Sequence, residues 1–312
     1  MIVLACPGQG SQTPGFLTPW LEAPNARDWL GDVSEQIKID LIEHGTVSDA
    51  DTIRRTEIAQ PLIVAAGILT WNQLRERLVT RDPQEVSFAG HSVGEVTAAY
   101  AAGVFDADTA IRFVSARATA MQKCADAVDT GMAAVVGGDP DEVIAHLEQH
   151  GLHAANFNGG GQIVAAGEHT QLAQLQQDPP PKARVMPLSV AGAFHTRFME
   201  PAREAMAANR EAYTAHAPGA TIYTNKDGSQ IVDGDEYVDT LISQIASPVR
   251  WDLCMDAFVA DGATGMVEVT PAGALAGLAR RGMRGVPTLK ISSPDDLDAA
   301  VEFILNTGEE EN

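Results

Sequence analysis

Residues 86–102 read VSFAGHSVGEVTAAYAA: an apolar run, the motif GHSVG at 90–94, and a row of small residues that Gly103 ends. A strand, a tight turn and a helix in this order are typical of a G-x-S-x-G nucleophile elbow. The turn requires glycine at its flanks, because a Cβ there would clash and push the serine off its exposed position. The N-terminus of the following helix favours negative charge that develops near Ser92. The stretch therefore predicts a nucleophilic serine on an α/β scaffold.

Apolar runs alternate with helical patterns along the chain, which is typical of an α/β protein with a mostly parallel sheet. Strands are predicted at 2–5, 86–89, near 222, at 266–269 and at 288–291. Helices are predicted at 60–78, 93–102, 107–128, 197–216, a stretch ending at 281, and 297–305. The region between the first strand and residue 60 is interpreted as a turn followed by a polar stretch.

Residues 132–188 follow a different pattern. Strands are predicted at 132–136, 152–157, 162–166 and 184–188, with helices after Asp139 and at 171–176. This β-α-β-β-α-β order is typical of a ferredoxin-like module. We therefore predict a large α/β domain over 1–128 and 190–312, with a ferredoxin-like small subdomain inserted at 129–189.

Composition excludes several classes of protein. The net charge of −21 argues against a nucleic-acid partner, because a basic surface is missing. No apolar run approaches the roughly 18 residues of a membrane span. Residues 1–6 lack the basic start of a signal peptide and are interpreted as a core strand. Three cysteines without a C-x-x-C pair exclude a disulfide framework and a cysteine zinc site. We expect a cytoplasmic protein without a metal.

A nucleophilic serine needs a general base, and the chain has eight histidines. Five of them fall in polar helices or loops and are interpreted as surface residues: His44, His146, His150, His153 and His169. His91 should point away from the elbow, and His216 ends a polar helix. His195 lies between an apolar strand and a helix, at a strand end where the sites of α/β proteins gather. We therefore predict His195 as the base.

Two further features leave alternatives open. The loop GQGSQ at 8–12 lacks the third glycine of a dinucleotide fingerprint, since Thr13 stands there. It is either a tight turn or a loop that faces the elbow, in which case Gln9 and Val93 supply the two N–H donors of an oxyanion hole. Arg117 lies on the apolar stripe of its helix, so its guanidinium either reaches the surface or holds a carboxylate. The second possibility would suit an acidic substrate.

Six motifs occur in one order: GQGSQ at 8–12, Gln60-Pro61, GHSVGE at 90–95, Arg117, AFHT at 193–196 and PVRW at 248–251. With them, essentially the whole chain resembles the malonyl-CoA:acyl-carrier-protein transacylases of type II fatty acid and polyketide synthesis. The resemblance implies a hydrolase-like large domain with a ferredoxin-like insert. It implies no cofactor, since malonyl-CoA is a substrate, and we expect a monomer.

The resemblance also assigns site residues. It implies Ser92 and His195 as the catalytic pair, Gln9 and Val93 as oxyanion donors, Arg117, Gln60 and Phe194 as substrate-binding residues, and the backbone carbonyl of Arg250 as the group that orients the imidazole. Arg250 stands where the family usually has glutamine, which a main-chain role would tolerate. The loop 268–273 also departs from the usual Gly-Pro-Gly form. Phe194 resembles the form associated with malonyl rather than methylmalonyl units.

The implied reaction is ping-pong transfer of a malonyl group from malonyl-CoA, through Ser92, to the phosphopantetheine thiol of acyl carrier protein. Carrier proteins of this type are acidic, so docking needs a local basic patch. Arg280, Arg281 and Arg284 form the densest basic cluster, with Lys182 and Arg184 as the alternative.

Two other functions remain open at this point. The first is a serine hydrolase, such as a thioesterase or a patatin-like lipase, with Asp227 or Asp261 as the acid. The second is a non-catalytic module that binds the carrier protein. Neither the pathway nor the particular carrier protein follows from the residues.

Overall fold

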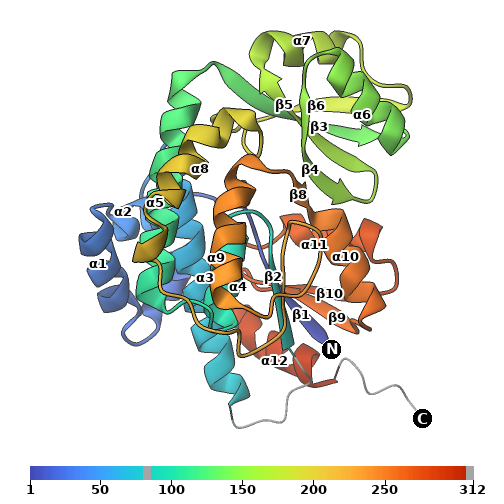
Figure 1. Ribbon diagram of the computed structural model, residues 1–312. Helices are drawn as coiled ribbons and strands as arrows, with labels where there is room; N and C mark the ends of the chain where they lie inside the picture. Colours follow the sequence, from blue (N-terminus) through green and yellow to red (C-terminus); the bar gives the residue numbers. More distant parts are fainter. Residues whose placement is uncertain (80–85, 307–312) are drawn as a thin grey trace.

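The first sheet carries the elbow. The computed structural model describes residues 1–79 and 86–306 (Figure 1). Five strands, all parallel, lie in the order β10 (Thr288–Lys290), β9 (Gly265–Glu268), β1 (Ile2–Cys6), β2 (Val86–Gly90) and β7 (Ile222–Tyr223). β1 is buried along its whole length, as expected for a central parallel strand covered on both faces. The predicted α/β class with a mostly parallel sheet is confirmed.

Helices cover both faces of this sheet. Ile2 and Leu4 face one core, which is shared with α3 (Thr56–Leu78), α4 (Gly94–Ala101), α5 (Ala107–Ala127) and α12 (Leu297–Asn306). Val3 and Ala5 alternate to the opposite core, which is shared with α10 (Trp251–Ala260) and α11 (Ala274–Gly282). The elbow between β2 and α4 therefore stands at the carboxyl edge of a rigid three-layer stack.

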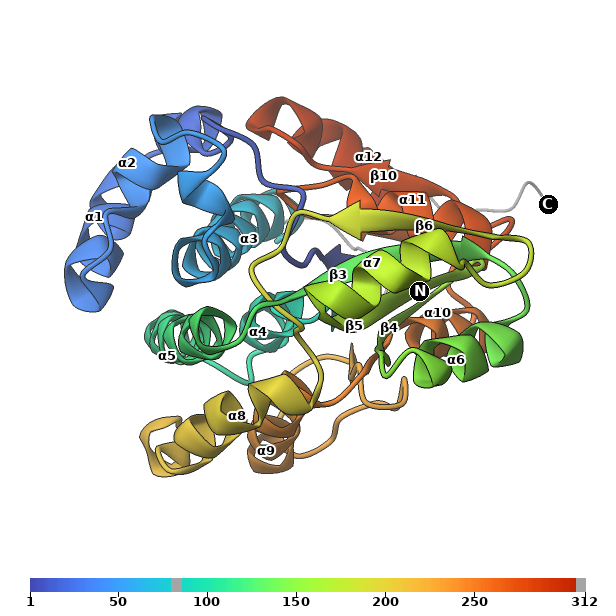
Figure 2. The same cartoon turned by 90° about the horizontal axis from the view of Figure 1, so that it is seen from above.

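A second sheet lies above the first. Its strands follow the order β6 (Ala183–Leu188), β3 (Thr130–Gly137), β5 (Gln162–Glu168), β4 (His153–Gly159) and β8 (Val249–Arg250). The first four are antiparallel, and α6 (Pro140–Gln149) and α7 (His169–Gln177) cover the face away from the first sheet (Figures 1 and 2). β8 pairs in parallel with β4 although it belongs to the C-terminal part of the chain. The predicted element order is present, and its division into a separate inserted domain remains a prediction.

Several helices lie where none was predicted. They are α1 (Ala26–Ile37), α2 (Leu41–Thr46), α9 (Gly234–Ser243) and α10. Short 3₁₀ helices occur at η1 (Thr18–Glu22), η2 (Thr52–Arg54), η3 (Arg197–Met199), η4 (Arg210–Ala212), η5 (Gln244–Ala246) and η6 (Pro294–Asp296).

The single helix predicted at 197–216 is wrong. The chain forms η3, then α8 (Glu200–Ala207), then η4. Beyond α8 the side chain of Asn209 donates to the carbonyl of Ala205 at 2.9 Å. Arg210 turns to the carboxylates of Asp235 and Asp239, at 2.8 and 2.6 Å. The local bond of Asn209 and the long-range ion pairs of Arg210 end the helix early.

Among residues 1–79 and 86–306, every helix falls short of the length and apolarity that crossing a membrane requires.

Candidate active site

Ser92 occupies the turn between β2 and α4 with a φ of 54°, a left-handed conformation that is uncommon outside glycine. The glycines around it are sterically required. A Cβ on Gly90 would lie 2.0 Å from the carbonyl carbon of Gly94, and a Cβ on Gly94 would lie 2.1 Å from the carbonyl oxygen of Cys6. The N–H of His91 donates to that same Cys6 oxygen at 2.9 Å. The end of β1 therefore holds the elbow tightly.

His195 meets the serine directly. Its Nε2 lies 2.6 Å from the Ser92 Oγ, and its Nδ1 lies 2.8 Å from the carbonyl oxygen of Gln244. A carbonyl only accepts, so the proton is on Nδ1, and Nε2 is free to accept the serine proton. Burial, and then the positive charge of Arg117, lower the pKa of His195 to about 3. The imidazole is therefore neutral at pH 7 and positioned as a base.

The carbonyl that orients His195 belongs to Gln244, so the prediction of Arg250 is wrong. Arg250 ends β8, where its N–H donates to the carbonyl of Asn225 at 2.8 Å and its guanidinium pairs with Asp252 at 2.8 Å. Gln244 follows the last residue of α9. It also opens η5, where its carbonyl accepts from the Ser247 N–H at 3.4 Å. A carbonyl oxygen has two lone pairs, so it can accept from His195 as well.

Arg117 reaches the nucleophile from α5. Its side chain is buried, with 3% of the residue exposed, which excludes the alternative of a surface arginine. Nη1 donates to Gln60 Oε1 at 2.5 Å, and Nη2 donates to Ser92 Oγ at 3.2 Å. Within the described part of the chain, no carboxylate forms an ion pair with it, and burial lowers its pKa to about 10 against the opposing charge of Glu95. A buried guanidinium beside the nucleophile that forms no such ion pair is a site for an anion.

The predicted oxyanion donors belong to the elbow (Val93) and to the loop at 8–12 (Gln9). Val93 is buried at the start of α4, and the backbone at Gly8 is so near that a Cβ there would lie 2.9 Å from the carbonyl oxygen of His91. The Gln9 side chain is engaged with the carbonyl of Arg54 at 3.0 Å. No group in residues 1–79 or 86–306 accepts a hydrogen bond from the backbone N–H of Gln9 or Val93. Their role as oxyanion donors remains a prediction.

Two buried residues that were not predicted hold the elbow in place. Asn225 follows β7, and its Oδ1 accepts from the Ser92 N–H at 2.7 Å while its Nδ2 donates to the Gly90 carbonyl at 2.6 Å. The Asn225 N–H donates to Glu95 Oε1 at 2.9 Å. Burial raises the pKa of Glu95 to about 7, against hydrogen bonds from Asn225 and Thr224. The sequence did contain a signal for Asn225, because it is a polar residue just beyond the carboxyl end of a predicted core strand.

A cavity of about 400 Å³ opens beside the elbow, between the two sheets. Loop 8–11, His91, the lower face of the second sheet and Arg281 of α11 line it. A larger cavity, of about 660 Å³, lies elsewhere, between α1, α5 and α8, along the side of α5 that carries Arg112 and Lys123. The smaller cavity is the one that borders the elbow, because His91, the neighbour of Ser92, lines it.

The remaining predicted residues divide into two groups. Phe194 is buried next to His195. Arg280, Arg281 and Arg284 are exposed at the end of α11 and beyond it, and in the described chain none of the three has an ion-pair partner. Arg281 alone of this group lines the cleft.

Comparison with known proteins agrees with this arrangement. A family model described as "Acyl transferase domain" matches residues 3–302. The malonyl CoA-acyl carrier protein transacylase of Mycobacterium tuberculosis is 47% identical over 298 residues, which cover 96% of this chain and 98% of that protein. The protein of the same name from Mycolicibacterium smegmatis is 44% identical over 287 residues, covering 91% and 98%.

Solved structures give the same result. The crystal structure of MCAT from Mycobacterium tuberculosis matches with a TM-score of 0.93 at 46% identity, covering 96% of this chain and 99% of that one. A malonyl-transacylase in complex with a type II PKS acyl-carrier protein matches with a TM-score of 0.88 at 25% identity, over 96% and 99%. The chain therefore belongs to the acyl transferase domain family and, within it, to the malonyl CoA-acyl carrier protein transacylases.

Proposed function

We propose that the protein transfers a malonyl group from malonyl-CoA to the phosphopantetheine thiol of an acyl carrier protein, through an ester on Ser92. One observation carries this proposal: the buried guanidinium of Arg117 lies 3.2 Å from the nucleophilic Oγ, and no carboxylate of residues 1–79 or 86–306 forms an ion pair with it. An acyl group with a free carboxylate at its far end would neutralise that charge. A hydrolase for neutral acyl chains would gain nothing from it.

In the first half-reaction, the Ser92 hydroxyl gives its proton to His195 Nε2 and its oxygen attacks the thioester carbonyl. The resulting oxyanion accepts from the N–H groups of Val93 and Gln9. The carbon–sulfur bond then breaks, and His195 returns the proton to the departing sulfur, so that coenzyme A leaves as a thiol. Malonate remains as an ester of Ser92 with its carboxylate on Arg117.

In the second half-reaction, His195 accepts the proton of the phosphopantetheine thiol, whose sulfur attacks the ester carbonyl. The carbon–oxygen bond to Ser92 breaks, and the serine oxygen recovers the proton. Arg117 fixes the acyl group so that a bound thiol approaches productively in competition with water. Every proton and charge is handled by the chain's own residues, so the proposal needs no metal or organic cofactor.

The carrier protein would dock near the mouth of the cleft. Arg280, Arg281 and Arg284 are exposed at the end of α11 and beyond it, and Arg281 lines the cavity beside the elbow, which supports a docking surface beside an arriving phosphopantetheine arm. A local basic patch is needed because the chain as a whole carries a charge of −21. The known complex of a related malonyl-transacylase with an acyl-carrier protein supports this class of partner. We further propose that the protein acts as a cytoplasmic monomer.

The test is intact-mass spectrometry after exposure to malonyl-, methylmalonyl- and acetyl-CoA. We expect a malonyl adduct that Ser92→Ala abolishes. Arg117→Ala should lower malonylation relative to acetylation by about 10- to 150-fold, from the loss of roughly 1.5–3 kcal/mol in charged hydrogen bonds. Arg112→Ala is the matched control, because Arg112 lies on the same helix but pairs with Asp108 on the exposed side.

Two results would contradict the proposal. Release of free malonate without a stable adduct would favour a hydrolase, and an unchanged malonyl-to-acetyl ratio in Arg117→Ala would refute the carboxylate role. Phe194 sets only a modest preference for malonyl over methylmalonyl groups, because the one methyl group that distinguishes them is worth about 1–3 kcal/mol. Weaker labelling by methylmalonyl-CoA than by malonyl-CoA is the expected pattern.

A further inference from the structure

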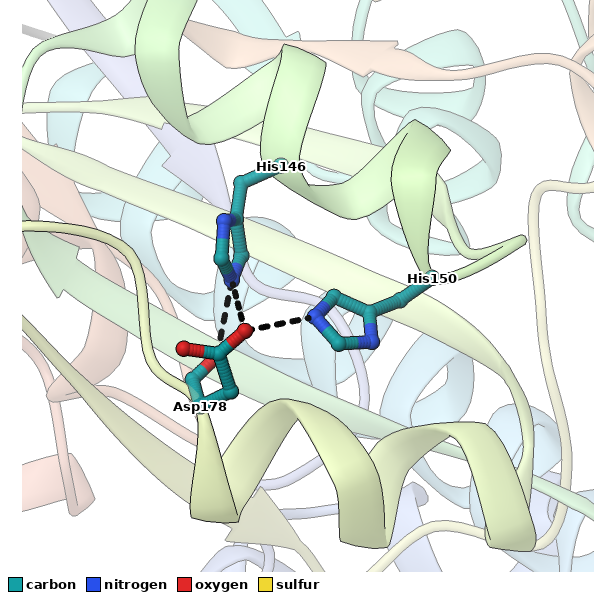
Figure 3. A group of neighbouring side chains, drawn as sticks. All are labelled: His146, His150 and Asp178. Atoms are coloured by element: carbon teal, nitrogen blue, oxygen red, sulfur yellow. Dashed lines mark hydrogen bonds and ion pairs between the residues drawn. The ribbon is translucent and has the colours of Figure 1, made fainter.

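A second cluster of chemically active side chains lies in the insert, at the ends of α6 and α7. His146 lies in α6, His150 follows one turn later as its C-cap, and Asp178 follows α7 (Figure 3). The Nε2 atoms of His146 and His150 lie 3.7 and 3.4 Å from the same Asp178 carboxylate oxygen. Both imidazoles are largely buried, whereas the Asp178 side chain is 72% exposed. Two imidazole nitrogens and one carboxylate therefore converge on one point that solvent can reach.

The spacing suits a divalent transition metal. In a tetrahedral zinc site with bonds of about 2.0–2.2 Å, neighbouring ligand atoms are about 3.3–3.6 Å apart. The three ligand atoms here all lie within 4.8 Å of one another, so small rotations of the side chains would complete the set. Histidines four residues apart on one helix present both nitrogens on the same side. The exposed side of Asp178 leaves room for a water as the fourth ligand.

The backbone favours a cation at the same place. His146 lies in the last turn of α6 and His150 caps its C-terminus, while Asp178 caps the C-terminus of α7. Helix C-termini carry partial negative charge and stabilise cations. At present the His146 Nε2–H donates to the Asp178 carbonyl at 2.7 Å. A metal at Nε2 would bind the neutral tautomer that carries its proton on Nδ1, so the metal bond would replace this hydrogen bond to the carbonyl.

Other histidines in the described chain have different surroundings. His195 meets Ser92, and His91 Nε2 meets the Asn158 side chain at 2.9 Å. His169 has one carboxylate, Asp129, at 3.6 Å. Within residues 1–79 and 86–306, the group His146, His150 and Asp178 is the single place where three such ligands come together.

The cluster lies on the side of the second sheet that faces away from Ser92. Residues Ala133 and Val135 of β3 pack toward Leu147 of α6, whereas Met132 and Ala134 line the cavity beside the elbow on the other face. A metal at the cluster would join α6 to α7 and leave the acyl-transfer residues untouched. We propose that His146, His150 and Asp178 form a binding site for a divalent transition-metal ion of the zinc class, which clamps these two helices together.

The test is calorimetric titration of the untagged full chain with Zn²⁺, at a pH where histidine is neutral. We expect one site per chain, lost or weakened by at least about tenfold in His150→Gln. Asp178→Asn gives an independent variant whose altered side chain is mostly exposed, so its folding is not in question. His169→Gln is the matched control, since His169 also faces an aspartate on the insert but has one carboxylate only.

A second readout identifies the ligands. Co²⁺ in place of Zn²⁺ should give visible absorption of tetrahedral type in the wild type and in His169→Gln, and lose it in His150→Gln and Asp178→Asn. Zn²⁺ should raise the unfolding temperature of the wild type and of His169→Gln, but not that of His150→Gln or Asp178→Asn. Malonyl transfer should be equal in all four. Binding weaker than about 100 µM in the wild type, or equal binding in all four proteins, would overturn the proposal.

Discussion

The amide of Asn225 is the most informative group to remove. It bonds to both sides of the turn that carries the nucleophile, at the Ser92 N–H and the Gly90 carbonyl, and its own N–H is held by Glu95. Asn225→Leu keeps the approximate volume of the side chain and deletes both hydrogen bonds. The substitution therefore tests whether the amide fixes the left-handed conformation of Ser92.

The expected magnitude follows from the two groups left unpaired. A buried donor or acceptor that loses its partner costs about 1–3 kcal/mol, so two of them would cost about 2–6 kcal/mol. Ser92 is only half-buried and its N–H can find water, so we expect the lower part of the range, about 2–4 kcal/mol. The φ of 54° at Ser92 stores a further 1–3 kcal/mol, approximately, which the turn can release by relaxing once the amide is gone. A displacement of about 1 Å at the nucleophile lowers the acylation rate by about 100-fold.

Urea unfolding measures the first effect, and rapid-quench malonylation of Ser92 measures the second, at a temperature where both proteins are folded. Thr224→Val is the control. It removes the hydroxyl that donates to Glu95 at 3.2 Å and does not touch the elbow, so it should lose stability but keep the acylation rate. If Asn225→Leu acylates at the wild-type rate, or no more slowly than Thr224→Val, the amide does not position the nucleophile.

Two other predictions concern charge. Burial raises the pKa of Glu95 from 4.5 to about 7, so the folded protein keeps a proton that the unfolded chain releases. Its contribution to stability is full below about pH 4.5 and is lost as pH rises through about 7. Glu95→Gln cannot ionise, so its free energy of unfolding relative to that of the wild type should increase between pH 5.5 and pH 8. If urea titrations give the same difference between the two proteins at both pH values, the assignment is wrong. Reversing Arg280 and Arg281 to glutamate should slow malonyl transfer to carrier protein by about tenfold or more and spare acylation by malonyl-CoA, whereas a loss seen only on reversing Lys182 and Arg184 would move the docking surface to the insert.

Much of the fold follows from local pattern. The elbow, the apolar strands and the long helix 107–128 combine short-range signals that agree with one another, and all have counterparts in β2, β1 and α5. α1 and α9 were open to the same reasoning, since Leu30 and Val33, or Tyr237 and Leu241, recur at helical spacing and are buried. The helix expected at 197–216 stops early because Arg210 binds two aspartates from α9. A contact of that kind has no signature in the local sequence.

The site divides in the same way. Ser92 carries its own motif, and His195 follows from the need for a base at a strand end. Gln244 acts through a main-chain carbonyl, which any residue could supply, so its side chain gives no signal. The sequence left the position of the Arg117 guanidinium open, because an arginine on an apolar stripe can either reach the surface or be buried. The packing of α5 against the elbow decides between these alternatives.

The short strand β8 has a consequence for protein engineering. Val249 and Arg250 complete the edge of the second sheet by pairing with Asn156 and Phe157. The chain reaches these two residues directly from Gln244, whose carbonyl orients the catalytic imidazole. Residues 129–189 therefore cannot be exchanged independently of the rest of the chain. Transplanting them from a relative would bring a foreign edge strand against the native β8, and any mismatch would be transmitted along a few residues to His195. A chimera that exchanges residues 129–189 should therefore exchange the segment 244–250 together with them.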